Sequence, residues 1–91
     1  HRARGRLMVV DDEAWLGAFL RELLQESGYA VDVFTSAHDA LAAFDAARTR
    51  YAAVITDLTM PQLSGLELAA EIHARHPDLP VVLCTGAARA P

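Results

Sequence analysis

Lysine and asparagine are both missing from this sequence of 91 residues, and cysteine occurs only once, as Cys84. All eight basic side chains are therefore arginines, so any mechanism that needs a lysine must do without one within these residues. A single cysteine excludes an internal disulfide and a zinc site built from cysteines, and it fits a reducing compartment such as the cytoplasm. No apolar run approaches the ~18 residues of a membrane-spanning helix, so we expect a soluble protein.

The charge balance argues against two classes of partner. Twelve acidic residues against eight basic ones leave a net charge of −4, and no basic stripe interleaved with aromatic residues is present. We therefore expect these residues to bind neither nucleic acid nor an anionic membrane surface. A chain of 91 residues with 53% hydrophobic composition is sufficient for one globular domain and leaves no room for a second.

The first six residues differ from the rest. This segment is rich in arginine, lacks an initiator methionine and is not followed by the apolar region of a signal peptide. We interpret residues 1–6 as a linker or an added lead, and residues 7–91 as one domain cut from a longer chain.

Apolar runs alternate with helical patterns along this domain. The runs predict strands at residues 7–10, 29–34, 51–56 and 81–85. Three stretches between them have apolar side chains at helical spacing, and the first stretch predicts a helix with one buried face formed by Trp15, Leu16, Phe19, Leu20, Leu23 and Leu24. The alternation of strands and helices predicts an α/β protein with a parallel, doubly wound sheet.

Local signals mark the helix boundaries. A glycine ends the first helix, and serine–acid pairs begin the other two: Gly28, Ser36 with Asp39, and Ser64 with Glu67. Asp32 stands in the middle of the second strand, and its charge favours an edge position for that strand.

Acidic side chains follow two of the predicted strands. Asp11 and Asp12 come directly after the first strand, Asp57 follows the third, and the hydroxyl of Thr85 ends the fourth. If the first and third strands are neighbours, the three carboxylates meet where ligands bind in open parallel sheets. Such a cluster needs a cation or raised pKa values, and a hard ion with positions left for water and phosphate points to Mg²⁺. Each aspartate by itself is better explained as an ordinary cap or solvated loop residue, so the inference depends on the set.

Three segments carry most of the distinctive residues: Val9-Val-Asp-Asp-Glu13, Asp57-Leu-Thr-Met-Pro-Gln-Leu-Ser-Gly65 and Val81-Val-Leu-Cys-Thr-Gly86. In this order and spacing they resemble the acidic pair, the phosphoacceptor loop and the fourth strand of one family, the receiver domain of two-component response regulators. The resemblance covers nearly the whole chain, and it implies a flavodoxin-like sheet with the strand order 2-1-3-4-5.

The resemblance also implies a role for each matching residue. Asp57 would accept a phosphoryl group from a histidine kinase or a histidine phosphotransfer domain, and Asp12 would bind Mg²⁺ directly with it. Asp11 would act mostly through a metal-bound water, and the backbone carbonyl of Thr59 would supply another oxygen. Thr85 would hydrogen-bond to the phosphoryl group and move inward as a switch.

The chain departs from the family towards its end. The family has a lysine after a fifth strand and an aromatic switch residue on that strand, and neither is present here. The resemblance therefore implies a receiver truncated after the fourth strand, without the fourth helix, the fifth strand and the fifth helix. Segment 83–86 and the basic lead resemble receivers attached to hybrid sensor histidine kinases. Because the fourth strand would be an apolar, uncharged edge, we expect self-association or domain swapping of the truncated chain.

Two other functions remain open at this point. A phosphatase similar to the haloacid dehalogenases would also place a nucleophilic aspartate and Mg²⁺ after a parallel strand, but it usually has a second aspartate where this chain has Thr59. A receiver-like domain that only docks to other proteins is the second alternative, and the intact set Asp11, Asp12, Asp57 and Thr85 argues against it.

Four further residues have ordinary explanations. His73 and His76 have a spacing compatible with metal binding, but we interpret them as solvated residues near the end of a helix. We interpret Cys84 as a buried, inert thiol. Trp15 is interpreted as a packing residue beside the acidic pair, where it would also serve as a fluorescence reporter.

Overall fold

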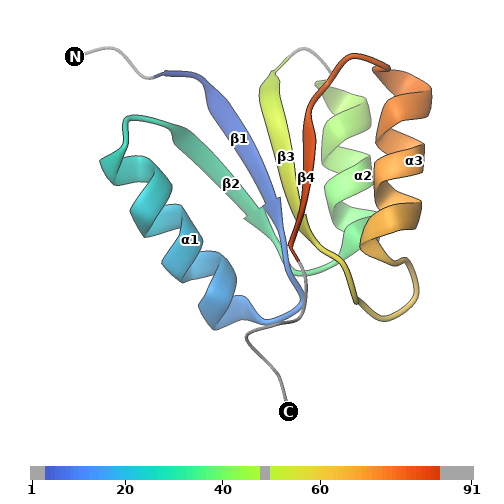
Figure 1. Cartoon of the computed structure of the whole chain (residues 1–91), viewed down its shortest axis with the longest axis horizontal. Coiled ribbons are helices and arrows are strands. Elements are labelled where there is room, and N and C mark those ends of the chain that lie inside the picture. Colours follow the sequence, from blue (N-terminus) through green and yellow to red (C-terminus); the bar gives the residue numbers. More distant parts are fainter. Residues whose placement is uncertain (1–3, 48–49, 85–91) are drawn as a thin grey trace.

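Strands and helices alternate along the part of the chain that the structure describes. The computed structural model describes residues 4–47 and 50–84. Its elements in chain order are β1 (Arg6–Val10), α1 (Ala14–Glu26), β2 (Ala30–Phe34), α2 (Ala37–Ala46), β3 (Tyr51–Asp57), α3 (Gly65–Arg75) and β4 (Val81–Cys84) (Figure 1). The predicted strands and helices are all present, with slightly shifted limits.

The strands form one parallel sheet in the order β2-β1-β3-β4. β1 therefore lies between β2 and β3, and β2 is an edge strand, as Asp32 indicated. This topology confirms the α/β, flavodoxin-like, doubly wound sheet. It also fulfils the condition that the first and third strands are neighbours.

β1 begins within the segment that we interpreted as a linker. Arg6 pairs with Ala30 of β2 and with Tyr51 of β3. Before it, the backbone N–H of Arg4 donates a hydrogen bond of 2.7 Å to the carbonyl of Gly28. Backbone pairing, which arginine supports as well as an apolar residue does, extends the strand beyond the apolar run. Residues 4–6 thus belong to the fold.

α2 and α3 cover one face of the sheet, and the main core lies between them and the strands (Figure 1). Apolar side chains of β1, β3 and both helices are completely buried there: Met8, Val10, Phe44, Val54, Leu68 and Ile72. Each such side chain contributes roughly 1.5–3 kcal/mol relative to an exposed one. This packing fixes the starts of α2 and α3 at the carboxyl edge of the sheet.

α1 packs on the opposite face, over β2 and β1 (Figure 1). The helix approaches the sheet closely at Gly17, where an added Cβ would lie only 2.6 Å from Cγ1 of Val33. Glycine at this position therefore allows the close contact between α1 and β2.

The predicted buried face of α1 is only partly right. Leucines 16, 20 and 24 are half-buried, but Trp15, Phe19 and Leu23 are 64%, 52% and 47% exposed. The interpretation of Trp15 as a packing residue is therefore wrong. Within residues 4–47 and 50–84, no helix covers β3 and β4 on the α1 side, and Val82 of β4 is 50% exposed as well. A pattern of apolar residues identifies a helix face but not how much of that face has something to pack against.

The predicted helix boundaries are confirmed. Ser36 Oγ accepts a hydrogen bond from the backbone of Asp39, and Ser64 and Glu67 form a reciprocal capping box with distances of 2.9 and 3.2 Å. Gly28 follows α1 with φ of 99°, a left-handed conformation that favours glycine. These local signals depend only on nearby backbone, which explains why sequence alone predicts them well.

A polar network around Asp32, in the middle of β2, joins this strand to the amino ends of β1 and β3. Asp32 accepts hydrogen bonds from the Arg6 guanidinium (2.6 Å) and the Tyr51 hydroxyl (2.7 Å), and Arg50 lies 3.7 Å away. Tyr51 is buried, and its ring stacks on Phe44 with centroids 6.3 Å apart. Burial, followed by the hydrogen bond and the negative charge of Asp32, raises the pKa of Tyr51 to about 12. The network therefore favours the protonated hydroxyl in the folded state.

We predict that this tyrosine makes folding sensitive to alkaline pH. Its pKa rises from 10.0 to about 12 on folding, so its contribution is complete below pH 10 and is lost as pH rises through 12. The free energy of unfolding should fall by roughly 2–3 kcal/mol across this range through Tyr51 alone. Urea unfolding at a series of pH values should show this loss in the wild type and a smaller one in Tyr51→Phe. Identical pH dependence in the two proteins would contradict the prediction.

We also predict that a chain of these 91 residues self-associates through β4. β4 carries no charge, exposes Val82 and has no strand beside its outer edge among residues 4–47 and 50–84, so this edge invites pairing with another strand. Sedimentation should show a mass above that of a monomer that increases with concentration. Val82→Lys should shift the distribution towards monomer, whereas Leu66→Lys, at an exposed position of α3, should leave it unchanged. A wild-type chain that stays monomeric throughout would refute this expectation.

Candidate functional site

Three carboxylates converge at the carboxyl edge of the sheet. Asp11 and Asp12 directly follow β1, and Asp57 ends β3. Each offers an oxygen, and these atoms all lie within 4.8 Å of one another. The convergence that we predicted from adjacent strands is therefore observed, because the pairing of Val10 with Thr56 brings both strand ends to the same level.

The three aspartates differ in exposure. Asp11 and Asp57 are only 3% and 4% exposed, whereas Asp12 lies at the surface. Asp11 is held on both sides: its backbone N–H donates to the carbonyl of Phe34 (3.0 Å), and its Oδ1 accepts from the backbone of Glu13 (2.9 Å). The site thus has two buried carboxylates, of which that of Asp11 is fixed by hydrogen bonds, and a third carboxylate that is open to solvent.

The loop after β3 is held by backbone contacts. The N–H of Leu58 donates to the carbonyl of Cys84 (2.9 Å), and the N–H of Gly65 donates to the carbonyl of Leu58 (2.9 Å). A Cβ on Gly65 would collide with the backbone of Asp57 and would lie 2.9 Å from Cα of Leu58. Glycine is therefore required for the loop to return this close to Asp57.

Two residues of the expected site are less defined. Thr59 lies exposed in the loop, two residues after Asp57. That its carbonyl binds a metal ion stays a prediction. Thr85, the expected switch, lies outside the described residues. The structure adds Thr56, which sequence reasoning missed: its hydroxyl is completely buried and donates to the carbonyl of Asp57 (3.1 Å). A hydroxyl residue just before the strand-ending acid is the only signal for it.

Cys84 lies next to the acidic cluster, since it pairs with Asp57 in the sheet. The thiol is half-buried and not fully buried as predicted, because β4 is the outer strand of the described sheet. Burial, and then the negative charges of Asp57 and Asp11, raise its pKa. The thiol therefore favours its protonated form, which agrees with the interpretation of an unreactive side chain.

His73 is not simply solvated. Its Nε2 lies 2.9 Å from the carbonyl of Leu79, a distance at which the ring donates a hydrogen bond to the segment that leads into β4. His76 forms the C-terminal cap of α3. The two histidines therefore have structural positions at the end of α3, far along the chain from the acidic cluster.

The acidic cluster has the chemistry of a site for a hard divalent cation. Three carboxylates this close repel one another, and a cation that shares their oxygens removes the repulsion. Oxygen ligands from few carboxylates, with one of them open to solvent, suit Mg²⁺, which keeps several waters. The residues present thus fit the predicted ion.

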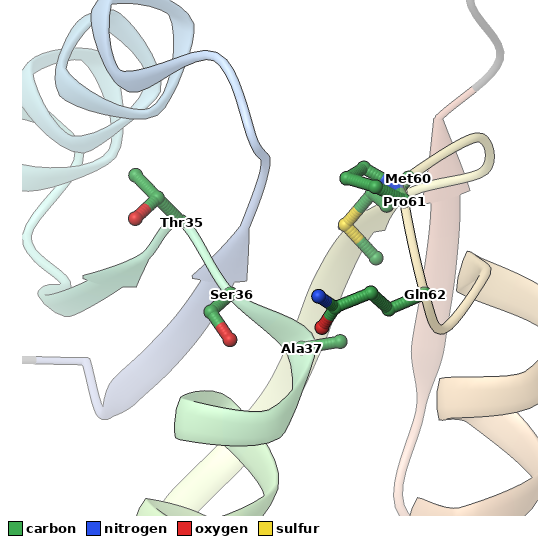
Figure 2. Close-up of a pocket in the computed structure, with 6 residues that line it drawn as sticks. All are labelled: Thr35, Ser36, Ala37, Met60, Pro61 and Gln62. Atoms are coloured by element: carbon green, nitrogen blue, oxygen red, sulfur yellow. The ribbon is translucent and has the colours of Figure 1, made fainter.

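A pocket of about 250 Å³ lies at the same edge of the sheet. It is lined by the turn between β2 and α2 and by the loop after β3, with Thr35, Ser36, Ala37, Met60, Pro61 and Gln62 as lining residues (Figure 2). Sequence reasoning missed this pocket, because its walls are far apart in the chain and meet only through the sheet.

The comparison with protein families agrees with this geometry. The family model that describes the response regulator receiver domain matches residues 7–91. The match covers most of the chain, so the chain belongs to the response regulator receiver domain family, as the three sequence motifs indicated.

Individual relatives include two curated regulators. The transcriptional regulatory protein QseB of Haemophilus influenzae is 38% identical over 80 residues, which are 88% of this chain and 35% of QseB. Response regulator MprA of Mycobacterium avium is 37% identical over 81 residues, 88% of this chain and 34% of MprA. The chain thus spans about a third of the length of these relatives.

Solved structures give the same fold. Response regulator protein TrrA of Thermotoga maritima, in complex with Mg²⁺–BeF, is 39% identical with a TM-score of 0.84, covering 93% of this chain and 72% of TrrA. A response regulator receiver domain protein from Clostridium thermocellum is 31% identical with a TM-score of 0.88, covering 91% of this chain and 66% of that one. In the described part of this chain, no helix has the length and apolar character needed to cross a membrane.

Proposed function

We propose that this domain is a phosphoacceptor in two-component signal transduction, with Asp57 as the residue that takes the phosphoryl group. The observation that carries the proposal is the position of Asp57. It is 4% exposed and lies at the end of a central strand. One of its carboxylate oxygens lies within 4.8 Å of a carboxylate oxygen of each of the two other aspartates. The matching receiver family supports the same role.

In the proposed reaction, a carboxylate oxygen of Asp57 attacks the phosphorus atom of a phosphohistidine on a histidine kinase or a phosphotransfer domain. The new bond joins this oxygen to phosphorus, the phosphorus–nitrogen bond of the donor breaks, and its electron pair stays on the imidazole. The product on this chain is an acyl phosphate. Backbone hydrogen bonds on both sides of the loop after β3 keep Asp57 in place for the attack.

The proposed Mg²⁺ ligands are Asp12, Asp57 and the carbonyl of Thr59, with Asp11 acting through a water. When bound, the ion supplies positive charge that offsets both the carboxylates and the phosphoryl oxygens. The exposed position of Asp12 supports this assignment, since it leaves an entry for a hydrated ion. Thr85 is proposed to donate a hydrogen bond to a phosphoryl oxygen, to move inward and so to pass the change to the surface.

Two neighbouring proposals complete the assignment. We place the domain in the cytoplasm, as its single cysteine suggested, and we propose no role for it in binding nucleic acid.

Family membership gives no support to a phosphatase similar to haloacid dehalogenases, and the close acidic cluster favours phosphorylation over a purely docking role. Turnover of a phosphate ester would favour the phosphatase, whereas labelling of one residue per chain would favour the receiver.

We predict that Asp57 is the labelled residue. The gene product that contains these 91 residues would be incubated with acetyl phosphate and Mg²⁺ and its intact mass recorded. The mass gain of one phosphoryl group should disappear in Asp57→Asn, because the amide cannot form the acyl phosphate. Asp78→Asn, at an exposed position before β4, serves as the control and should be labelled like the wild type. Labelling of Asp57→Asn at another aspartate would show the assignment to be wrong.

We further predict that Mg²⁺ binding depends on Asp12. Titration with MgCl₂, followed by the emission of Trp15 at the start of α1, should give a dissociation constant that rises about tenfold or more in Asp12→Ala. Glu22→Ala, on the exposed surface of α1, should bind like the wild type. Equal affinity of Asp12→Ala and wild type would exclude Asp12 as a ligand.

A further inference from the structure

The pocket at the carboxyl edge of the sheet has no role in the function proposed so far. One wall is the turn from β2 into α2, with Thr35, Ser36 and Ala37, and the other is the loop segment 60–62 after β3 (Figure 2). The side chain of Gln62 points across the pocket towards Ser36 and Ala37 (Figure 2). These two walls follow β2 and β3, which both pair with β1, so the sheet brings them together.

Each wall contains one residue of the main core. Met60 and Ala37 are only 9% and 6% exposed and belong to the main core. Ser36 is fixed as the cap of α2, since its Oγ accepts the backbone N–H of Asp39 (3.3 Å). These fixed residues hold part of the pocket in place before anything binds, which lowers the entropic cost of binding.

The lining selects an uncharged occupant. Met60, Pro61 and Ala37 offer apolar surface, the amide of Gln62 points across the pocket, and no lining side chain carries a charge. A charged group would be desolvated there without a partner. The volume of about 250 Å³ is below that of most small-molecule sites and is suited to a single side chain.

The position of the pocket indicates whose side chain it receives. Met60 is three residues after Asp57, so their Cα atoms are separated by at most about 11 Å. The opposite wall begins directly after Phe34, whose carbonyl accepts a hydrogen bond from the backbone N–H of Asp11 (3.0 Å). A protein that delivers a group to Asp57 typically covers about 800 Å² of the surface around it, a patch large enough to reach the pocket.

We propose that this pocket is a socket for one uncharged side chain of the protein that donates the phosphoryl group, with an apolar body and a hydrogen-bonding end. The proposal rests on the phosphoacceptor function of Asp57. The socket contributes to recognition of the donor protein and takes no part in the chemistry, so small phosphodonors do not need it.

The backbone of Gln62 supports a role in binding. Its φ of 71° lies in the left-handed region, and within the described residues it is the only residue other than glycine with a positive φ. Glycine would adopt this conformation without strain, and asparagine tolerates it better than glutamine does. A strained glutamine whose side chain points into a pocket is consistent with a residue kept for its amide.

The test compares two phosphodonors on one set of variants. The gene product would receive phosphoryl groups either from acetyl phosphate or from a panel of phosphorylated histidine phosphotransfer domains. Gln62→Gly should raise the melting temperature, because it removes backbone strain, and should slow transfer from the protein donor about three- to tenfold, the effect of one lost hydrogen bond. Labelling by acetyl phosphate should be unchanged.

Two further variants sharpen the test. Gln62→Asn keeps an amide and should recover part of the transfer rate. Gln25→Ala, on the exposed surface of α1, is the matched control and should behave like the wild type.

The outcomes separate the socket from the function on which it rests. Unchanged transfer from the protein donor in Gln62→Gly, or equal slowing with both donors, would overturn the socket. So would a panel in which no phosphotransfer domain labels the wild type although acetyl phosphate does. Saturable binding of a small neutral molecule at residues 35–37 and 60–62 without any effect on transfer would do the same. If neither acetyl phosphate nor any phosphotransfer domain labels Asp57, the phosphoacceptor function itself is refuted.

Discussion

The parallel pairing of β1 with β3 is the constraint on which the rest of the site depends. Val10 lies opposite Thr56, so the residues that follow both strands emerge side by side at the carboxyl edge. This single register brings Asp11 and Asp12 to Asp57, with carboxylate oxygens within 4.8 Å. A shift of one residue would turn Asp57 to the other face of the sheet. The cluster is therefore a consequence of strand pairing more than of any local motif.

The repulsion within this cluster is the energetic cost of keeping it. Two of its carboxylates are almost fully buried, so little water is available to screen their negative charges, and hydrogen bonds or a cation must compensate. Asp11 receives part of this compensation from the backbone of Glu13. The main core under α2 and α3, with its completely buried apolar side chains, stabilises the strands that hold the cluster together. Stability thus comes from one face of the sheet, and chemistry is concentrated at one edge.

The two faces of the sheet are covered unequally, and the surface of the domain follows from this. α2 and α3 bury their face, whereas α1 lies over β2 and β1 and leaves Phe19 and Val82 half exposed or more. At the carboxyl edge, the same connections create the pocket beside Met60 and Gln62. Acidic cluster, pocket and open apolar surface are therefore three results of one arrangement of crossovers around a four-stranded sheet.

The amino-acid sequence by itself determined the element order, the helix caps and the candidate acids, because these depend on apolar periodicity and on contacts between residues close in the chain. The strand order came from the family resemblance and not from periodicity. Tertiary structure alone decided which predicted apolar face is buried: the half of α1 that carries Trp15 stays exposed, since nothing described packs against it. It also decided that Arg6 belongs to β1, that Cys84 is half-buried and that His73 reaches the carbonyl of Leu79. Each of these depends on partners distant in sequence, whose proximity exists only once the sheet has formed.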